Sequence, residues 1–554
     1  MALGLFRQRI WLALCLTCVL CVAWSEALAA PKLKANVTDA RQALQAGEDF
    51  ERNRRWIDAI EHYEASIKKW PDDRDLSYGL RRSKIHFGIE RRYSDSSFRT
   101  NMLTISRHEA LSLFDEVINK IKSHFVDPLS STSFVAHGTE NLYIALANEK
   151  FLEHHLPGRR MAIQSNIAKF RETLRTQYWN KSLNSGSSAY QTVSEVAGLA
   201  EAQFGLNSTA VVMEYVFGGC HALDDYSNCL TPDRLSDLYD NIDGEFVGLG
   251  IEMKAEAGRG MSLANVLPES PAAEAGLIAG DYIVGIDGHD CRNMSTDEAA
   301  GRLKGTPGSR VRLDVAGLTA ADRRTVTVAR RAVQVKSIPI AKIVDESRGI
   351  GYIQMTGFQK SSPAELDEAL QKLNRQGMRV LIWDLRGNPG GLLTAAVEVL
   401  DRFIDNGVLV STKGRIGDQN MSYSAHRQQK WNIPLVLLTD ENSASASEIV
   451  AGAVKDHQRG VIVGRKTYGK WSVQSIFPIQ RSVGLRLTTA KFYSPAGKTL
   501  GKIGVKPDVE VELPDHVVLH RGQMANSLED DPDVRKALDV AREQAAGRPM
   551  FSNR

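Results

Sequence analysis

The sequence lacks the features that mark several specialised classes of protein. Only six of its 554 residues are cysteine, and 69 Lys and Arg nearly balance 66 Asp and Glu, for a net charge of +3. So few cysteines exclude a disulfide framework, and a balanced charge without runs of like sign argues against a nucleic-acid partner. Glycine (44) and proline (18) are too few for collagen or a low-complexity chain.

What remains is the composition of an ordinary globular chain. Hydrophobic residues make up 43% and charged residues 24% of the sequence. At roughly 150 residues per domain, the length predicts three or four domains. No motif in the sequence calls for a metal or a cofactor, and we predict neither.

A marked apolar run lies at the amino terminus. Arg7 and Arg9 precede the apolar residues 10–24, and the small residues 27–30 follow before Pro31. This layout predicts a signal peptide over residues 1–30 and export to the periplasm or envelope. The run is short for a bilayer span, and the alternative is an uncleaved amino-terminal anchor.

Loss of residues 1–30 leaves three cysteines, Cys220, Cys229 and Cys291. In an oxidising compartment Cys220 and Cys229 are close enough in sequence to bridge a short loop. The alternative is that all three are reduced and buried, and the sequence does not decide between these two states.

The region after the signal is predicted to be helical. In residues 31–100 the spacing matches one tetratricopeptide repeat with a capping helix near residues 76–89, which favours a module that binds a protein partner. An ordinary helical pair without a partner is the alternative. Residues 101–243 are predicted to form a helical arm, which the polar residues 182–188 interrupt as a surface loop. The residues that carry the repeat spacing are Gly47, Phe50, Ala59, Tyr63, Ser66 and Pro71.

Residues 244–333 show short β-like runs. A helix is predicted to begin at Ser270 and to end at Gly276, and residues 281–288 read as a strand closed by an Asp-Gly turn. This series resembles a PDZ domain. The resemblance implies that a glycine loop binds a peptide carboxylate and that the next strand adds the peptide to the sheet. A PDZ-like fold with a blocked groove is the minority alternative. The implied peptide-binding residues are Val247, Gly248, Leu249, Gly250 and Ile251.

From residue 334 to 514 predicted strands and helices alternate, and a helix is expected in the tail at 515–554. Repeated βα units predict a largely parallel sheet covered by helices, with chemistry where strands end and helices begin. The predicted strands are 350–355, 380–383, 434–438 and 461–463, and the predicted helices are 362–377, 392–403 and 446–455.

Two strand-to-helix turns hold residues suited to chemistry. Residues 384–391 form a glycine-rich turn that lacks the lysine of a phosphate loop, and residues 441–448 place three serines at a helix start. Taken alone, the first is a tight turn and the second an ordinary helix cap. A serine nucleophile also needs a base. His426 and His457 read as surface residues, whereas Lys470 begins a β-like run where burial favours a neutral amine.

Together these motifs resemble the carboxyl-terminal processing peptidases, also called tail-specific proteases, from about Glu109 to Pro514. The resemblance implies a serine endopeptidase with an α/β crotonase-like (ClpP-like) core. The predicted whole is therefore a multidomain α+β chain with helical, PDZ and peptidase parts. Besides the PDZ loop and the two turns, the matching segments are residues 223–227, 230–232, 464–470 with Gln474, and 487–495.

The resemblance also implies roles for single residues. Ser445 is the nucleophile, Lys470 the general base, and Gln474 orients the lysine. The oxyanion hole is the N–H of Ala446 with one N–H from Gly390 or Gly391, and the sequence does not decide which glycine donates. The implied substrates are proteins with unstructured or apolar carboxyl-terminal tails.

Trp471 departs from the family, which generally has glycine there, so either the substrate channel is reshaped or Lys470 is placed differently. This departure leaves open a catalytically inactive PDZ/tetratricopeptide scaffold, and the implied core leaves open a crotonase-type acyl enzyme. Domain order further predicts that the PDZ segment gates Lys470 and Gln474.

Overall fold

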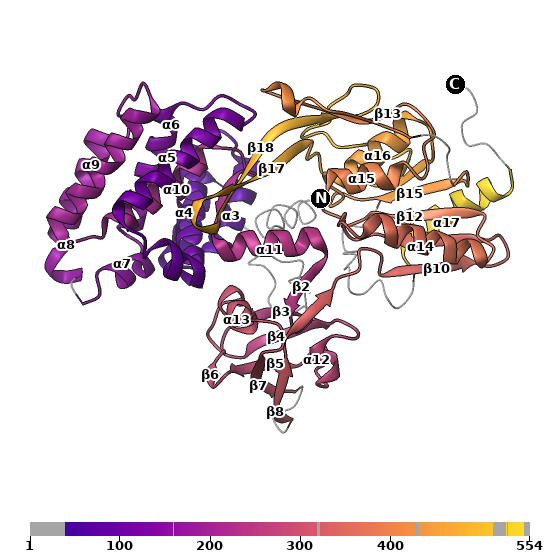
Figure 1. The fold of residues 1–554 in the computed structure, drawn as a ribbon, viewed down its shortest axis with the longest axis horizontal. Coiled ribbons are helices and arrows are strands. Elements are labelled where there is room, and N and C mark those ends of the chain that lie inside the picture. The colour runs from indigo at the N-terminus through magenta and orange to yellow at the C-terminus, as the bar shows by residue number, and fades with distance from the viewer. Residues whose placement is uncertain are drawn as a thin grey trace.

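The computed structural model describes residues 39–158, 160–317, 322–426, 431–512, 528 and 530–547. The predicted signal peptide lies outside these ranges. Within them, no helix combines the length and the apolar character that crossing a membrane requires. The predicted multidomain α+β architecture is confirmed: a helical region, a β-rich domain and an α/β core follow one another along the chain (Figure 1).

The first two helices form a helical hairpin, and the third helix packs on it. The ring of Tyr63 fills the space between two glycines: a Cβ added at Gly47 would lie 2.3 Å from it and one at Gly79 2.5 Å from it. Small residues at these positions are therefore what lets the helices approach. The helices are α2 (Ala40–Arg52), α3 (Trp56–Lys69) and α4 (Arg74–Ser94).

The helical arm packs around α10, which is buried along almost its whole length. Of the predicted surface loop at 182–188, residues 182–185 lie between helices, whereas residues 186–188 already form the first turn of α9. The thiols of Cys220, Cys229 and Cys291 are free and buried, so the structure corresponds to the reduced alternative. The arm helices are α5 (Arg107–His124), α6 (Ser131–Ala145), α7 (Glu149–His155), α8 (Arg160–Thr173), α9 (Gly186–Phe204), α10 (Ser208–Gly219) and α11 (Pro232–Asp243).

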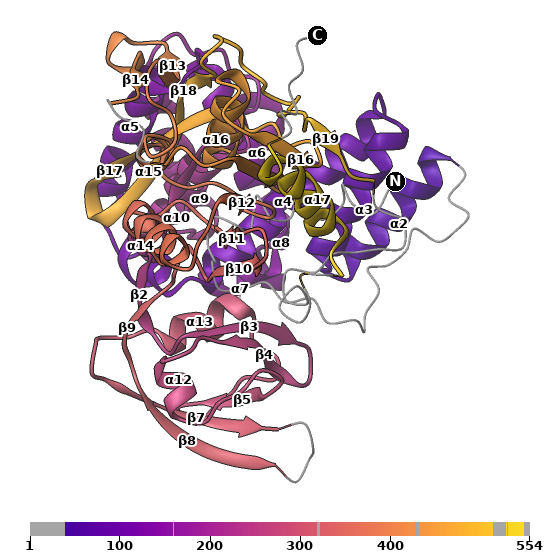
Figure 2. The same ribbon diagram turned by 90° about the vertical axis from the view of Figure 1, so that its right-hand side faces the viewer.

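The β-rich domain hangs below the other two parts on the two-stranded ribbon of β2 (Glu245–Gly248) and β9 (Arg331–Gln334) (Figure 2). Its main sheet has the order β3-β4-β5-β7-β8, with β6 paired to β5, so among the described strands β3 lies at one edge. The elements are β3 (Ile251–Glu256), β4 (Gly260–Val266), β5 (Tyr282–Ile286), β6 (His289–Asp290), β7 (Arg310–Ala316), β8 (Arg323–Ala329), α12 (Pro271–Glu274) and α13 (Thr296–Leu303).

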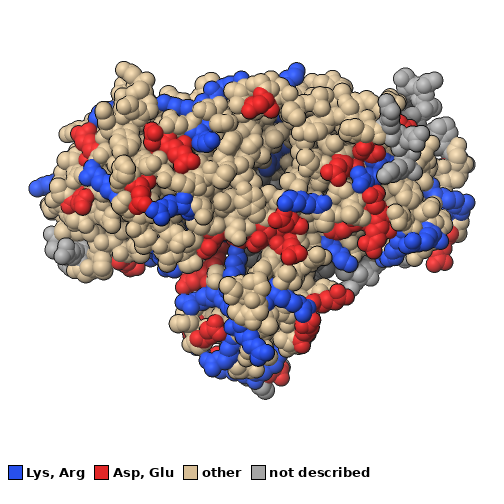
Figure 3. Space-filling model, viewed as in Figure 1, with Lys and Arg blue, Asp and Glu red and all other residues tan. Residues whose placement is uncertain are grey.

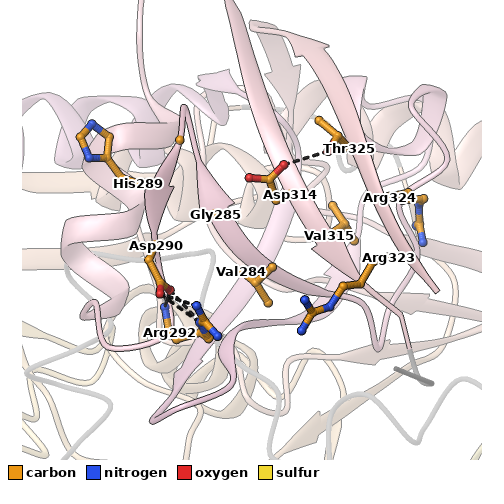
Figure 4. Close-up of a pocket in the computed structure, with 11 residues that line it drawn as sticks. Val284, Gly285, His289, Asp290, Arg292, Asp314, Val315, Arg323, Arg324 and Thr325 are labelled. Atoms are coloured by element: carbon orange, nitrogen blue, oxygen red, sulfur yellow. Dashed lines mark hydrogen bonds and ion pairs between the residues drawn. The ribbon is translucent and has the colours of Figure 1, made fainter. Parts of the chain in front are cut away.

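A polar pocket of about 470 Å³ lies on this domain, between the β5–β6 hairpin and the strands β7 and β8 (Figure 4). Asp290 pairs with Arg292, and Thr325 donates to Asp314. Asp290 and Arg292 therefore neutralise each other, and the hydroxyl of Thr325 satisfies one oxygen of Asp314. The pocket lies at least two strands away from the predicted peptide-binding edge at β3.

The core has a six-stranded sheet of order β10-β11-β12-β15-β16-β19, parallel except for the antiparallel edge strand β10. Helices α14, α15 and α16 pack their apolar sides against one face, and α17 packs against the other. The predicted parallel sheet is thus present. Its elements are β10 (Ile340–Asp345), β11 (Ile350–Gln354), α14 (Ser362–Arg375), β12 (Val380–Asp384), α15 (Leu393–Leu400), β15 (Leu435–Thr439), α16 (Ala446–Asp456), β16 (Val461–Gly464), β19 (Val509–Glu510) and α17 (Pro532–Ala545).

A second sheet, antiparallel, joins the core to the helical arm. The sequence predicts only its run at 470–477: β1 and β13 pair with β18 across long separations, whereas β17 with β18 and β13 with β14 form local hairpins. Apolar residues of its β17–β18 hairpin enter the same cluster as those of α5 and α10. The strands are β1 (Asn228–Leu230), β13 (Val408–Gly414), β14 (Ser422–Ser424), β17 (Ser472–Ile479) and β18 (Val483–Tyr493).

Charges on the surface are mixed rather than segregated. On the face drawn in Figure 3, acidic and basic side chains alternate over all three parts, and a recess lies between the helical arm and the core. Among the described residues, this face therefore shows no extended basic track of the kind that binds nucleic acid.

Candidate active site

The two predicted turns follow the neighbouring parallel strands β12 and β15, so they meet at one edge of the sheet. The main chain of Asn388 holds them together: its carbonyl accepts from the N–H of Ala444 at 3.0 Å and from the hydroxyl of Ser447 at 2.9 Å. A second link runs from the N–H of Gly387 to the carboxylate of Asp440 at 2.8 Å. The turns are therefore a single hydrogen-bonded unit.

Of the three serines in the second turn, Ser445 differs in exposure and conformation. Ser443 and Ser447 are buried, and their hydroxyls donate to the carbonyls of Leu385 and Asn388. Ser445 is half-buried and stands at the start of α16 with φ +55°. That backbone conformation is strained for a residue with a side chain and is typical of functional turns.

Two backbone N–H groups beside Ser445 have no acceptor among the described residues. One belongs to Ala446, in the first turn of α16, where helix geometry leaves N–H groups unpaired. The other belongs to Gly391. Its two neighbours form a short parallel β-bridge with Phe358: the Gly390 carbonyl accepts from the Phe358 N–H, and the Leu392 N–H donates to the Phe358 carbonyl. The N–H of Gly391 therefore points away from Phe358.

The N–H of Gly390 is occupied, because it donates to the side chain of Asn388 at 2.9 Å. The Gly390 backbone nevertheless lies directly against the serine turn: a Cβ added there would be 2.8 Å from both the Ala446 nitrogen and the Ser445 Cβ. With φ +102°, this position is open only to glycine.

Glu448 connects the serine turn to the loop that carries Lys470. Its Oε2 accepts from the N–H of Ser445 at 2.9 Å and from the N–H of Lys470 at 2.8 Å. Its Oε1 accepts from the hydroxyl of Thr467 and the N–H of Gly469, both at 2.7 Å. Burial raises the pKa of Glu448, and these four donors oppose that shift by stabilising the carboxylate.

Lys470 lies on the loop between β16 and β17, and its ammonium sits 4.7 Å above the ring of Tyr226. Gln474 lies on β17, where its amide nitrogen donates to the hydroxyl of Ser472 at 2.9 Å and to that of Thr488 at 3.4 Å. The structure thus brings the backbones of Ser445 and Lys470 onto one carboxylate oxygen, while these bonds hold Gln474 against β18.

Comparison with known proteins identifies the core. Residues 349–511 match the model of peptidase family S41, and residues 263–317 match that of the PDZ domain. The carboxyl-terminal-processing protease of Picosynechococcus is 33% identical over 376 residues, which cover 67% of this chain and 84% of that protein. The chain belongs to peptidase family S41.

A second curated relative agrees with this membership. The carboxy-terminal-processing protease of Bartonella bacilliformis is 35% identical over 298 residues, which cover 53% of this chain and 68% of that protein. The solved photosystem II D1 C-terminal processing protease is 24% identical, with a TM-score of 0.39 and coverage of 78% of this chain and 98% of that one. As an S41 member, the chain is a serine peptidase with a PDZ domain.

The residues predicted to bind peptide lie where this PDZ domain turns from its ribbon into its main sheet. Val247 and Gly248 pair with β9, Leu249 and Gly250 form the turn, and Ile251 begins β3. At the far end of β3 the N–H of Ala255 donates to the hydroxyl of Thr296, the first residue of α13, at 3.0 Å. The edge of β3 is therefore capped at that end.

Trp471, next to Lys470, lies inside the S41 core. Its indole is buried, packs against Phe492 with ring centroids 4.6 Å apart and the ring planes tilted by 31°, and lies against Gly452 of α16. The bulky side chain therefore fills space between Phe492 of β18 and Gly452 of α16, and the two alternatives, a reshaped channel or a displaced Lys470, both stay predictions.

Sequence analysis assigned no role to Glu448 or Asn388, although both organise the site. A signal for Glu448 is present, because Ser445 and Glu448 have the S-x-x-E spacing of a helix capping box. No comparable local signal identifies Asn388, whose partners Met355, Ala444 and Ser447 come from other strands and turns.

Proposed function

We propose that this protein is an endopeptidase that cleaves proteins near their carboxyl termini, with Ser445 as nucleophile and Lys470 as general base. The observation that carries the proposal is the Glu448 carboxylate, which binds the backbones of both residues through one oxygen. Nucleophile and base are thereby fixed relative to each other although 25 positions separate them in sequence.

The proposed reaction uses only side chains and backbone groups of this chain. A neutral Lys470 amine takes the proton of the Ser445 hydroxyl as its oxygen attacks the peptide carbonyl. The N–H groups of Ala446 and Gly391 stabilise the oxyanion, helped by the positive end of α16. The lysine then gives its proton to the leaving amine, and water, deprotonated by the same lysine, hydrolyses the acyl-enzyme.

We assign the second oxyanion donor to Gly391 rather than Gly390. The Gly390 N–H already donates to Asn388, whereas the Gly391 N–H has no acceptor among the described residues. An oxyanion hole requires donors that are not otherwise engaged, so Gly391 is the better candidate.

The described arrangement corresponds to a resting site. A ring beneath an ammonium favours the charged form, so the contact with Tyr226 opposes a neutral Lys470. Gln474 would have to leave Ser472 and Thr488 to orient the lysine. We propose that tail binding at the PDZ domain moves both residues into place, which makes the PDZ domain a gate.

The wider proposal concerns substrate, location and partners. We infer that β3 receives unstructured or apolar tails by strand addition next to residues 247–251, and that residues 1–30 direct export. The helices α2, α3 and α4 form a tetratricopeptide-like unit available to a protein partner, and the peptidase core is crotonase-like. No nucleic acid, metal or cofactor takes part in this proposal.

The test is cleavage of a protein with an apolar carboxyl-terminal tail by the purified chain. Ser445→Ala and Lys470→Ala should each abolish cleavage, because the first removes the nucleophile and the second removes the group that accepts its proton. Lys466→Ala, at an exposed position on the same loop, is the matched control and should cleave like the parent.

Two other outcomes would favour the alternatives. If a fluorophosphonate probe does not label Ser445 and no cleavage occurs, the chain is a scaffold. If acyl-CoA binds and the tailed protein remains intact, an acyl enzyme is indicated. Equal cleavage by the Ser445→Ala variant and the parent would refute the assignment.

A further inference from the structure

The helix α17, beyond the matched S41 region, places carboxylates beneath both active-site turns. Asp531 caps its start by accepting from the N–H groups of Asp533 and Val534, at 2.9 and 3.2 Å. The side chains of Asp531 and Asp533 are only 4% and 0% exposed. Buried carboxylates are costly unless they are paired, so their partners are informative.

One partner is Arg386, in the glycine-rich turn. Its Nη1 donates to both oxygens of Asp531, at 3.0 and 2.9 Å, and to Asp533 at 2.9 Å. The rest of the guanidinium binds Asp384 at the end of β12, which also accepts from Tyr352. Burial lowers the pKa of Arg386, but the surrounding carboxylates outweigh this and raise it, so the arginine remains charged.

The other partner is Arg465, which opens the loop to Lys470. Its Nη1 donates to both oxygens of Asp533, at 2.8 and 2.9 Å. Its Nε donates at 2.9 Å to Glu441, the first residue of the serine turn. Asp533 therefore binds both Arg386 of the glycine-rich turn and Arg465 of the Lys470 loop. Through Glu441, Arg465 also contacts the serine turn.

The position of α17 is itself fixed by apolar packing. Val534, Ala537, Leu538 and Ala541 are buried against the sheet face opposite the helices α14 to α16. The carboxylate pair therefore stands on a rigid element. A rigid anchor shared by three turns is what the alignment of oxyanion donors, nucleophile and base requires.

We propose that Asp531 and Asp533 are positioning residues for catalysis: through Arg386 and Arg465 they set the relative placement of the oxyanion turn, the serine turn and the Lys470 loop. This inference rests on the proposed function, because it assumes that Ser445 and Lys470 do the chemistry. It makes the carboxyl-terminal helix part of the active-site scaffold.

The test compares two isosteric changes on the same helix in the full chain. Asp533→Asn removes the shared charge, and Asp539→Asn is the control, because Asp539 is exposed and pairs only loosely, at 3.6 Å, with Arg542. Since a small misplacement of catalytic groups can cost about a hundredfold in rate, we expect Asp533→Asn to lower kcat by about ten- to a hundredfold. KM and the affinity of the PDZ domain for a tail peptide should remain within about twofold, and Asp539→Asn should match the parent.

The outcomes separate this inference from the proposed function. If Ser445→Ala is as active as the parent, the proposed function fails. If Ser445→Ala is inactive but folded Asp533→Asn keeps its kcat, or changes only KM or thermal stability, the positioning role is overturned.

If Asp533→Asn does not fold, as judged by circular dichroism, Glu441→Gln tests the same link from its partly exposed end. A loss of about threefold or more in kcat supports the inference. A kcat equal to that of the parent overturns it.

Discussion

At the scale of single residues, Glu448 links more parts of the proposed active site than any other side chain described above. Its two oxygens accept four hydrogen bonds, from three backbone N–H groups and one hydroxyl, in a site that is fully buried. Only a carboxylate can accept at both oxygens without offering a donor. The residue therefore determines the geometry of the proposed nucleophile and base without contacting substrate.

We expect Glu448→Gln to impair both folding stability and catalysis. The amide group turns one acceptor into a donor that faces N–H groups, and a buried unsatisfied donor costs about 1–3 kcal/mol. The free energy of unfolding should fall by about 2–4 kcal/mol, and kcat should fall by about a hundredfold while KM changes little. Urea unfolding and steady-state cleavage of a tailed substrate measure the two effects.

Glu398→Gln is the control for this prediction, since Glu398 is exposed on α15 of the same core. It should leave both quantities unchanged. A Glu448→Gln variant with parental kcat would contradict the bridging role.

The site could be predicted from sequence only where its residues are neighbours in a motif. Ser445, Ala446 and the glycine turn stand in short ordered segments, so the chain itself indicates them. The choice of Gly391 over Gly390 could not be made, because it depends on where the Asn388 side chain points. The contact of Lys470 with Tyr226 likewise joins segments more than 240 residues apart.

At the scale of elements, the parallel sheet was predictable and the antiparallel one was not. Each βα unit carries its own local pattern: a buried strand, a turn and an amphipathic helix. The antiparallel sheet instead pairs β1 with β18 and β13 with β18, across separations of roughly 80 to 260 residues. Pairings of that kind leave no local trace in a single sequence.

Trp471 holds β17 against the serine helix, and we expect Trp471→Gly to loosen that contact. Loss of a fully buried tryptophan side chain leaves a cavity and costs about 3–5 kcal/mol. Because Lys470 precedes it directly, kcat should fall with stability. Trp471→Phe retains the packing against Phe492 and should recover most of both quantities, as measured by thermal unfolding and peptide cleavage.

A specific result would contradict this view of β17. If Trp471→Gly retained the stability of the parent, the indole would not be a packing element. If it lost stability but kept kcat, packing against Gly452 would not affect the base.

At the scale of the whole molecule, the PDZ domain is docked to the helical region by charge. Asp297, in the first turn of α13, pairs at 2.8 Å with both Arg91 of α4 and Arg234 of α11. Lys304, just past the other end of α13, pairs with Asp237 of α11. The helix next to the proposed peptide-binding edge at β3 is thus the same one that pairs with the helical region, so the proposed tail site and the docking contact share one element.

This docking should depend on pH in a direction that the structure defines. Burial alone would raise the pKa of Asp297, but Arg91 and Arg234 outweigh it and hold the pKa below the ordinary 3.8. A carboxylate whose pKa is lowered by its partners stabilises the docked state above pH 3.8, and this contribution is lost as the pH falls through the lowered value. Asp297→Asn should mimic that loss at neutral pH.

The measurement is the distance distribution between spin labels on β8 and on α9. The parent should give a narrow distribution at pH 7 that broadens in acid, and Asp297→Asn should be broad at both, because neither arginine retains its charged partner. Asp290→Asn is a stringent control: the pKa of Asp290 is likewise lowered, to about 2, by its hydrogen bonds to Arg292, but both residues lie within the PDZ domain. A narrow distribution for Asp297→Asn, or an equally broad one for Asp290→Asn, would show that this ion pair does not fix the position of the domain.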